Sequence, residues 1–248
     1  MNDDKIAAMR EGGRVLGTIL QELLGFSRPG TSLLDIEALA QKRIVQAGMK
    51  PSFSTVANYQ WATCLCVNEV IVHGIPTGYR LKEGDLLTID IGLINRGFHV
   101  DTAWTKVVGG KDDTFLEVGQ EALKKAIDQA KAGNRVGHIS KAIQEIIEGA
   151  GYGVVKTLVG HGVGKTLHEP PQIPGFVRGS IEKTPRLTVG MTIAIEVIYA
   201  MGSPAITYYD DGWSIATRDH SLSAVFEQTI AVTDSKPLIL TPAPLDEA

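Results

Sequence analysis

The sequence predicts a mixed α/β (α+β) fold in which a helix–helix–sheet unit occurs twice around one curved antiparallel sheet. Three observations support this class. Apolar residues first recur at helical spacing in two consecutive segments, strand-like sequence follows them, and the same order of elements then returns. Of the 248 residues, 44% are apolar, which is enough for a sizeable core. We expect one domain, residues 1–248, with halves of roughly 1–110 and 111–248.

The first half begins with two predicted helices. Residues 6–23 and 33–44 carry apolar residues at helical spacing, and Pro29-Gly30 separates them. From residue 53 to 108 the composition turns to Val, Ile, Leu and Thr, punctuated by Gly and Asn. This composition predicts a series of short strands.

The second half repeats the pattern, with helical stripes over residues 115–127 and 136–147 and strand-like sequence after them. The starts of the second helices also match at a fixed offset: Gly30, Leu33 and Ile36 correspond to Gly133, Val136 and Ile139. An internal duplication is therefore predicted. The halves should pack as one pseudo-symmetric sheet with helices on its outer face, and the groove between them is the natural place for a site.

The charge distribution argues against a polyanionic partner. The net charge is -4, and its 24 basic and 28 acidic residues are scattered, so no nucleic-acid or membrane arm is expected. Residues 1–5 lack the apolar core of a secretory signal. The two cysteines, Cys64 and Cys66, are one residue apart, where a bridge would be strained. A reducing cytoplasm is the expected location.

Two aspartates lie on a predicted hairpin. Asp90 interrupts an apolar strand-like run, and the chain turns at Asn95-Arg96-Gly97 and returns through Asp101. Counted from the turn, the two acids fall opposite each other or one diagonal step apart, so they can share a face. A single acid on a strand usually faces solvent, but two in register on an apolar sheet repel each other and lose solvation. A bound cation would relieve both costs.

The second half contains the same anomaly. Glu196 and Glu227 each stand alone inside a strand-like apolar run. If the duplication holds, their strands correspond to those of Asp90 and Asp101, which brings four carboxylates together. That much negative charge exceeds the charge of one divalent ion.

His161 is the candidate nitrogen ligand, because its neighbours Gly160 and Gly162 should leave it well exposed. Oxygen-rich ligation with one imidazole suits Mn, Fe(II), Co or Zn. Two carboxylates that bridge would hold two ions about 3.5–4 Å apart, where they lower the pKa of a shared water and polarise a substrate carbonyl. Such ions can also bind a free substrate amine. The chemistry expected is aminopeptidase hydrolysis.

A nucleotide-binding loop is the rival reading of residues 160–166, which contain Gly164-Lys165-Thr166. A P-loop needs a glycine five residues before Gly164, and that residue is Val159. The proline-rich residues 168–174 also cannot form the helix that would hold the phosphate. The P-loop reading is therefore rejected.

The assembled motifs resemble the methionine aminopeptidases of the bacterial type over nearly the whole chain. The motifs are the Asp90 and Asp101 pair, Gly160-His161-Gly162-Val163-Gly164, His168-Glu169, Glu196, Glu227, Asn68-Glu69-Val70-Ile71-Val72-His73-Gly74-Ile75-Pro76 and Asp211-Gly212-Trp213-Ser214. The resemblance implies the pita-bread fold and removal of an N-terminal methionine that precedes a small residue. It also implies nascent polypeptide N-termini as partners, with the ribosome as a candidate partner, and a monomer.

The resemblance further implies roles for individual residues. Asp90 would hold one of two divalent ions, His161 and Glu196 the other, and Asp101 and Glu227 would bridge them. Glu196 would also carry protons. His73 and His168 would contact the substrate backbone and stabilise the transition state, although either histidine alone is more often structural.

The methionine pocket maps by resemblance onto Tyr59, Cys64 and Trp213, with Phe53 as a further candidate; core packing is the alternative for each. The chain departs from the family pattern at Val56, where an aromatic residue is common, and at Val197, where proline is usual. Two other functions remain open at this point. One is a proline-specific aminopeptidase or dipeptidase of the same fold, and the other is a non-catalytic relative that binds protein or RNA.

Overall fold

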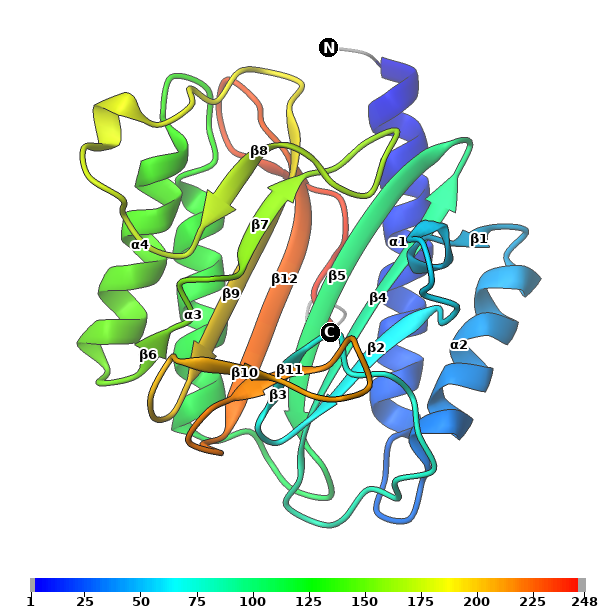
Figure 1. Ribbon diagram of the computed structural model, residues 1–248. Coiled ribbons are helices and arrows are strands. Elements are labelled where there is room, and N and C mark those ends of the chain that lie inside the picture. Colours follow the sequence, from blue (N-terminus) through cyan, green and yellow to red (C-terminus); the bar gives the residue numbers. More distant parts are fainter. Residues whose placement is uncertain (1–2, 245–248) are drawn as a thin grey trace.

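The computed structural model describes residues 3–244 and has four long helices and one large sheet (Figure 1). The helices are α1 (Asp3–Phe26), α2 (Leu33–Gln46), α3 (Thr114–Asp128) and α4 (Val136–Gly149), with the short 3₁₀ turns η1 (Phe53–Thr55) and η2 (Ile181–Lys183). The strands are β1 (Lys50–Pro51), β2 (Thr63–Val67), β3 (Val70–Val72), β4 (Leu86–Asn95), β5 (Phe98–Val107), β6 (Gly153–Val154), β7 (Val159–Gly162), β8 (Glu169–Pro174), β9 (Thr192–Ala200), β10 (Ile206–Tyr208), β11 (Ile215–Thr217), β12 (Ser223–Ala231) and β13 (Leu238–Ile239). The predicted order of helices and strands is confirmed.

The large sheet has ten strands, and its main path runs β1-β4-β5-β12-β9-β7-β8 with antiparallel neighbours. β5 and β12 adjoin at its centre, so this pair joins the first half of the chain to the second. A smaller sheet, β10-β11-β3, mixes strands from both halves and crosses in front of the large sheet in Figure 1. Both sheets therefore connect the halves.

The helix–helix–sheet unit occurs twice, as the sequence predicted. The backbone N–H of Gly30 donates to Leu81 O at 2.7 Å, and that of Gly133 donates to Leu187 O at 3.2 Å. Both glycines have φ close to +90°, a conformation that L side chains rarely adopt. The glycine match at the helix starts therefore reflects a shared turn geometry.

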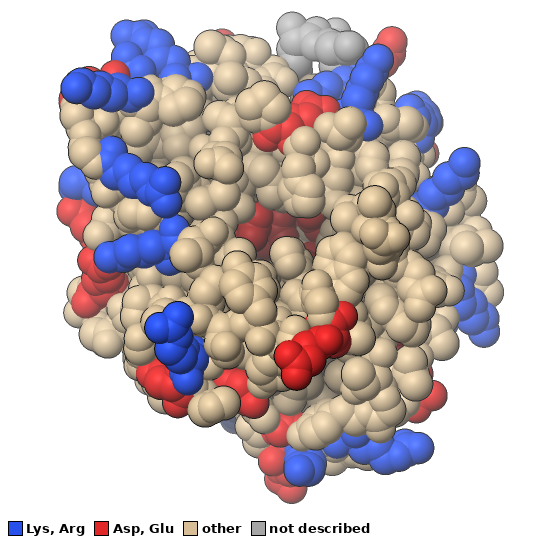
Figure 2. All heavy atoms as spheres, viewed as in Figure 1, with Lys and Arg blue, Asp and Glu red and all other residues tan. Residues whose placement is uncertain are grey.

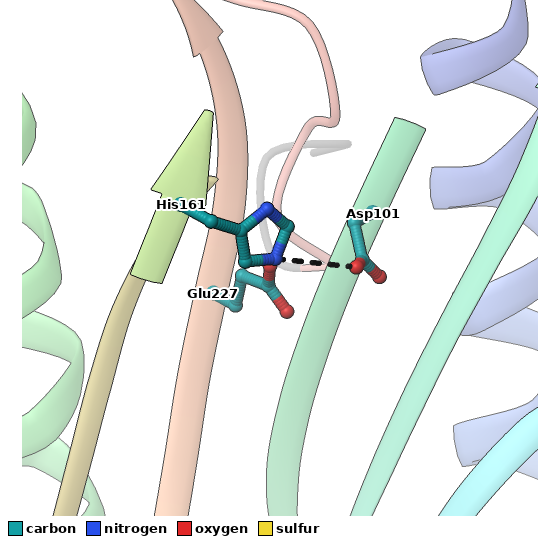
Figure 3. Close-up of side chains that lie close together, drawn as sticks. All are labelled: Asp101, His161 and Glu227. Atoms are coloured by element: carbon teal, nitrogen blue, oxygen red, sulfur yellow. Dashed lines mark ion pairs between the residues drawn. The ribbon is translucent and has the colours of Figure 1, made fainter. Parts of the chain in front are cut away.

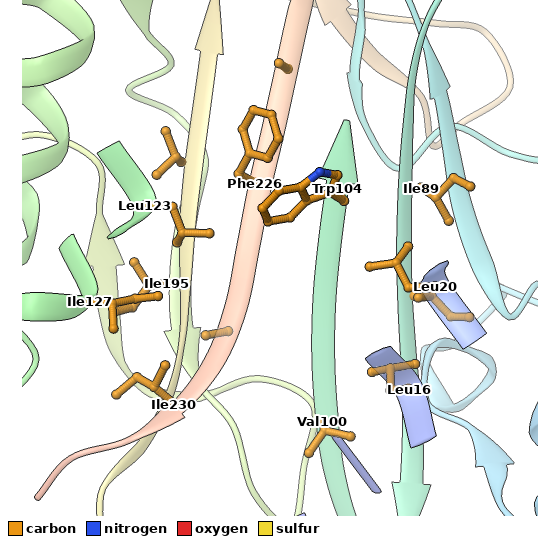
Figure 4. Close-up of a cluster of buried hydrophobic side chains, with 14 of the residues drawn as sticks. Leu16, Leu20, Ile89, Val100, Trp104, Leu123, Ile127, Ile195, Phe226 and Ile230 are labelled. Carbon is orange, nitrogen blue, oxygen red and sulfur yellow. The ribbon is translucent and has the colours of Figure 1, made fainter. Parts of the chain in front are cut away.

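One face of the large sheet packs against the helices and forms the main core (Figure 4). In this core, Leu20 of α1 and Leu123 of α3 lie among the apolar side chains of the two halves. At the joint between the halves, the rings of Trp104 and Phe226 meet edge to face at 4.9 Å. None of the helices within residues 3–244 combines the length and apolar character needed to cross a bilayer. The opposite face of the sheet is left for the candidate site.

Candidate active site

The four predicted carboxylates lie on the four central strands of the large sheet, on the face away from the helices. Asp90 pairs with Ala103, and Asp101 pairs with Gly92, so the two aspartates are one diagonal step apart. This is one of the two arrangements that the hairpin predicted. Glu196 on β9 directly faces Glu227 on β12.

Ala103 occupies the centre of this arrangement. It pairs with Asp90 on one side and with Glu227 on the other, so Asp90, Ala103, Glu227 and Glu196 form one row across β4, β5, β12 and β9. By strand pairing, the counterpart of Glu227 in the first half is therefore Ala103, and Asp101 lies two residues away. A methyl group at the centre of the row leaves space between the acids that a larger side chain would fill.

The acids of this row line a cavity of about 130 Å³, far more than the roughly 15 Å³ that one water needs. Figure 2 shows acidic atoms at the bottom of the corresponding hollow. All the residues predicted for the site line this cavity: Phe53, Tyr59, Cys64, His73, Asp90, Asp101, His161, His168, Glu196, Trp213 and Glu227. The groove between the halves is thus where the predicted residues meet.

His161 enters the cavity from β7. Its side chain is directed toward Asp101 and Glu227 (Figure 3), and each of the three offers a ligand atom within 4.8 Å of the others. Its Nε2 lies 3.9 Å from Asp101 Oδ2 and 3.6 Å from Glu196 Oε1. Its Nδ1 lies 2.9 Å from Gly162 O, and an Nδ1–H donated to this carbonyl leaves the Nε2 lone pair facing the acids.

The expectation that His161 is well exposed is wrong. The residue is only 7% exposed, because β7 is paired on both sides by β8 and β9. Burial lowers the pKa of His161 to about 4, so the imidazole is neutral at pH 7. A neutral imidazole is the form that binds a metal.

Two further histidines lie at the rim. His73 follows β3 in a left-handed conformation with φ of 58°, and His168 lies between β7 and β8. The His168 ring packs 4.4 Å from the His161 ring. Both side chains are exposed at the rim, and the partial loss of their hydration lowers the pKa of each; in His73 the proximity of His168 lowers the pKa further. Both can therefore act as neutral hydrogen-bond donors at pH 7.

The apolar wall of the cavity is formed by Tyr59, Cys64 and Trp213, with Phe53 and Val56 beside them. The Tyr59 ring packs edge-on against Trp213 at 4.9 Å. The Tyr59 hydroxyl donates to Thr63 O at 2.8 Å and lies 3.2 Å from Cys64 Sγ. Tyr59 and Trp213 come from loops, whereas Cys64 lies on β2 directly opposite Asp90.

Comparison with known families agrees with this geometry. A model described as metallopeptidase family M24 matches residues 7–234. The chain belongs to metallopeptidase family M24.

The chain is similar to a methionine aminopeptidase 1 of Bacillus subtilis, which is 41% identical over 96% of each chain. The crystal structure of a methionine aminopeptidase from Thermotoga maritima superposes with a TM-score of 0.93 at 37% identity, covering 97% of this chain and 98% of that one. A prolidase from Pyrococcus horikoshii has a TM-score of 0.77 at 22% identity, covering 98% of this chain and 63% of that one, and so shares the fold. The mixed α/β pita-bread class is confirmed.

The acids of the site suit the divalent cation that a metallopeptidase uses. Burial raises the pKa of Asp90, Asp101, Glu196 and Glu227 well above the usual range, and their mutual repulsion raises it further. Asp90 Oδ1 and Glu227 Oε1 are buried and have no hydrogen-bond partner among the residues that the structure describes. A cation would supply the missing partner and favour the ionised carboxylates.

The structure excludes a P-loop, because the chain after Gly164 continues through a loop into strand β8 (Glu169–Pro174), where a P-loop would continue into a helix. His99, which is not among the residues predicted from the sequence, supports this region. Its ring lies 2.7 Å from Ser52 Oγ, and its backbone N–H donates to Gly164 O at 2.7 Å. The His168 loop is thereby tied to β5. The available signal was that His99 lies two residues before Asp101, on the same face of one strand.

Proposed function

We propose that this metallopeptidase removes the N-terminal methionine from nascent polypeptides whose second residue is small. The observation that carries the proposal is one cavity in which a carboxylate–histidine cluster adjoins a wall of Tyr59, Cys64 and Trp213. A narrow apolar pocket along this wall fits the unbranched thioether side chain of methionine. A cation held by the carboxylate–histidine cluster at the end of the pocket would bind the substrate amine. The relatives named above as methionine aminopeptidases support the same activity.

We propose that two divalent transition-metal ions, Co, Mn, Fe(II) or Zn, occupy the cluster. Asp90 would hold one ion, His161 and Glu196 the other, and Asp101 and Glu227 would bridge them. When bound, the ions supply an acidified water and polarise the substrate carbonyl. The four carboxylates carry enough negative charge for two such ions, and the two unpaired oxygens are available as ligand atoms.

Side chains of the protein would transfer protons, donate hydrogen bonds to the substrate and orient it. Glu196, buried at the cluster, would take a proton from the attacking water and return it to the leaving amine. His73 and His168 would donate hydrogen bonds to the substrate backbone and to the oxygen that gains charge in the transition state. The apolar wall would orient the first side chain so that the first peptide bond lies at the cluster.

We expect the purified protein with added Mn or Co to release methionine from Met-Ala-Ser. An N-acetylated Met-Ala-Ser should remain intact, because it lacks the free amine. Ala-Pro should also remain intact, which separates this activity from that of a proline-specific peptidase. Chromatographic detection of free amino acids measures all three. Cleavage of Ala-Pro in preference to Met-Ala-Ser would overturn the substrate assignment.

His168→Ala should lower kcat on Met-Ala-Ser by about 100-fold, the usual effect of removing one donor to a transition-state oxygen. Alanine removes the imidazole donor and its ring contact with His161. Manganese binding measured by calorimetry should stay unchanged, because His168 is not among the proposed ligands. A variant that keeps its kcat, or that loses its metal, would contradict this role.

We also propose that residues 1–248 act as one catalytic domain with halves of roughly 1–110 and 111–248, as a monomer in the cytoplasm, with the ribosome as a candidate partner. The free thiols of Cys64 and Cys66 support a reducing compartment. Sedimentation of the protein alone and with ribosomes tests both the monomer and the partner.

A further inference from the structure

A buried carboxylate lies behind the apolar wall, outside the cavity. Glu37 on α2 is 2% exposed and accepts hydrogen bonds from four neutral donors. These are Ala62 N at 2.7 Å, Thr63 N at 3.0 Å, Thr63 Oγ1 at 2.5 Å and Gln41 Nε2 at 2.6 Å. Burying an acid lowers the stability of the fold unless hydrogen bonds satisfy its oxygens. When all of these hydrogen bonds are formed, the network holds the surrounding chain in one local conformation.

Glu37 contacts the chain where strand β2 begins. Further along the free edge of β2, the N–H of Leu65 donates to Gly74 O at 2.8 Å, just after His73. Two residues earlier, the N–H of Thr63 has Glu37 as its acceptor. The carboxylate therefore takes over as the edge partner at the start of the strand.

Thr63, which Glu37 holds, is hydrogen-bonded to the apolar wall. Thr63 O, on the same residue whose N–H and hydroxyl bind Glu37, accepts the hydroxyl of Tyr59. Tyr59 in turn packs against Trp213, and the next residue, Cys64, lines the cavity. Glu37 thus fixes the outer side of a segment whose inner side forms the wall.

We propose that Glu37 is a positioning residue that sets the affinity and selectivity of the pocket for the first side chain of the substrate. The inference rests on the proposed function. Glu37 is not among the residues that line the cavity, so its loss should act on substrate binding and not on the chemical step. The effect should appear in KM and in the preference for methionine over leucine, whose branched side chain a well-fixed wall excludes.

The test is Glu37→Gln, which keeps the shape of the side chain. Its amide NH2 must face either the donors Ala62 N and Gln41 Nε2 or the two donors of Thr63, so one pair of hydrogen bonds is lost. We expect KM for Met-Ala-Ser to rise about tenfold, the effect of losing one hydrogen bond to a charged group. The kcat should change less than about twofold, and the ratio of kcat/KM for Met-Ala-Ser over Leu-Ala-Ser should fall about tenfold. Manganese affinity by calorimetry should be unchanged. Thr63→Val, which removes only the hydroxyl contact, should shift KM in the same direction by less.

Asp35→Asn is the matched control on the same helix. Asp35 accepts from Ser32 N and Ser32 Oγ in the capping box of α2, so the variant should melt at a lower temperature without a change in KM or selectivity. Unchanged KM and selectivity in Glu37→Gln, or equal changes in Asp35→Asn, would overturn the inference. If Glu37→Gln does not fold, KM and selectivity are measured in Thr63→Val instead, and unchanged values there would equally overturn the inference. Failure of the unmodified protein to cleave Met-Ala-Ser would instead refute the proposed function.

Discussion

Asp101→Asn should lower kcat/KM on Met-Ala-Ser by more than about 1,000-fold while the protein stays folded. Asparagine keeps the size of the side chain and the oxygen that accepts from Thr102 N at 3.0 Å. It removes a negative charge from the group formed with His161 and Glu227, whose ligand atoms all lie within 4.8 Å of one another. Metal affinity and turnover should therefore fall together. Steady-state kinetics and manganese calorimetry measure the two losses.

Asp85→Asn provides the matched control. Asp85 is also a buried acid, but it lies outside the cavity and accepts from Asn68 Nδ2, Tyr79 Oη and Lys82 N. Its replacement should destabilise the protein by about 1–3 kcal/mol and leave kcat unchanged. In the metal-free state, Asp101→Asn should instead stabilise the protein, because it relieves repulsion among the buried carboxylates, and it should abolish most of the activity. Retention of activity in Asp101→Asn would refute its assignment as a ligand.

Removal of the metal with a chelator should abolish turnover and make the stability gained through Asp101→Asn depend on pH. The folded-state pKa of Asp101 lies well above its ordinary value of 3.8, first because of burial and then because of Asp90. At low pH the acid is protonated in both the folded and the unfolded state, so folding costs no ionisation energy there, and the protein is more stable than at higher pH. This extra stability is lost as the pH rises through the folded pKa. Metal-free Asp101→Asn should therefore exceed the unmodified protein in stability by a margin that grows as the pH rises above 3.8 toward the folded-state pKa of Asp101.

The stability of Asp101→Asn is compared with that of the unmodified protein because buried histidines change stability with pH in the opposite direction to Asp101. The pKa of His161 is lowered to about 4, so its contribution to stability rises with pH between that value and 6.5. In both proteins this contribution is similar and largely cancels from the difference. Manganese at 1,000 times its Kd should stabilise the unmodified protein by about 4 kcal/mol and reverse the order of the two proteins. Urea unfolding at each pH, with chelator or manganese, supplies the measurement; a margin that shrinks with pH would contradict the prediction.

The parts of the site that depend on local chain geometry could be predicted from the sequence. The hairpin of β4 and β5 turns at Arg96 and Gly97, both with positive φ, and such a two-residue turn fixes the register over its strands. The diagonal relation of Asp90 and Asp101 follows from that register. The pairing of β5 with β12 joins residues more than 120 positions apart, and no local pattern encodes it. The position of Ala103 opposite Glu227 was therefore not predictable.

The burial of His161 and of Glu37 could not be predicted for the same reason. His161 is covered by strands that arrive later in the chain, and Glu37 looks in the sequence like an ordinary acid on a helix surface. The wall residues Tyr59 and Trp213 were reached through family resemblance alone, since loop positions have no periodicity to read. Their packing against each other is visible only in the structure.

The separation of the acids from the wall has a consequence for how this scaffold can change over time. The carboxylates lie on adjacent strands, where main-chain hydrogen bonds leave little freedom, while Tyr59, His168 and Trp213 lie on connections between elements. Connections tolerate replacement far better than central strands do. New substrate preferences can therefore evolve by exchanging a few surface segments while the hydrolytic machinery beneath them is inherited intact.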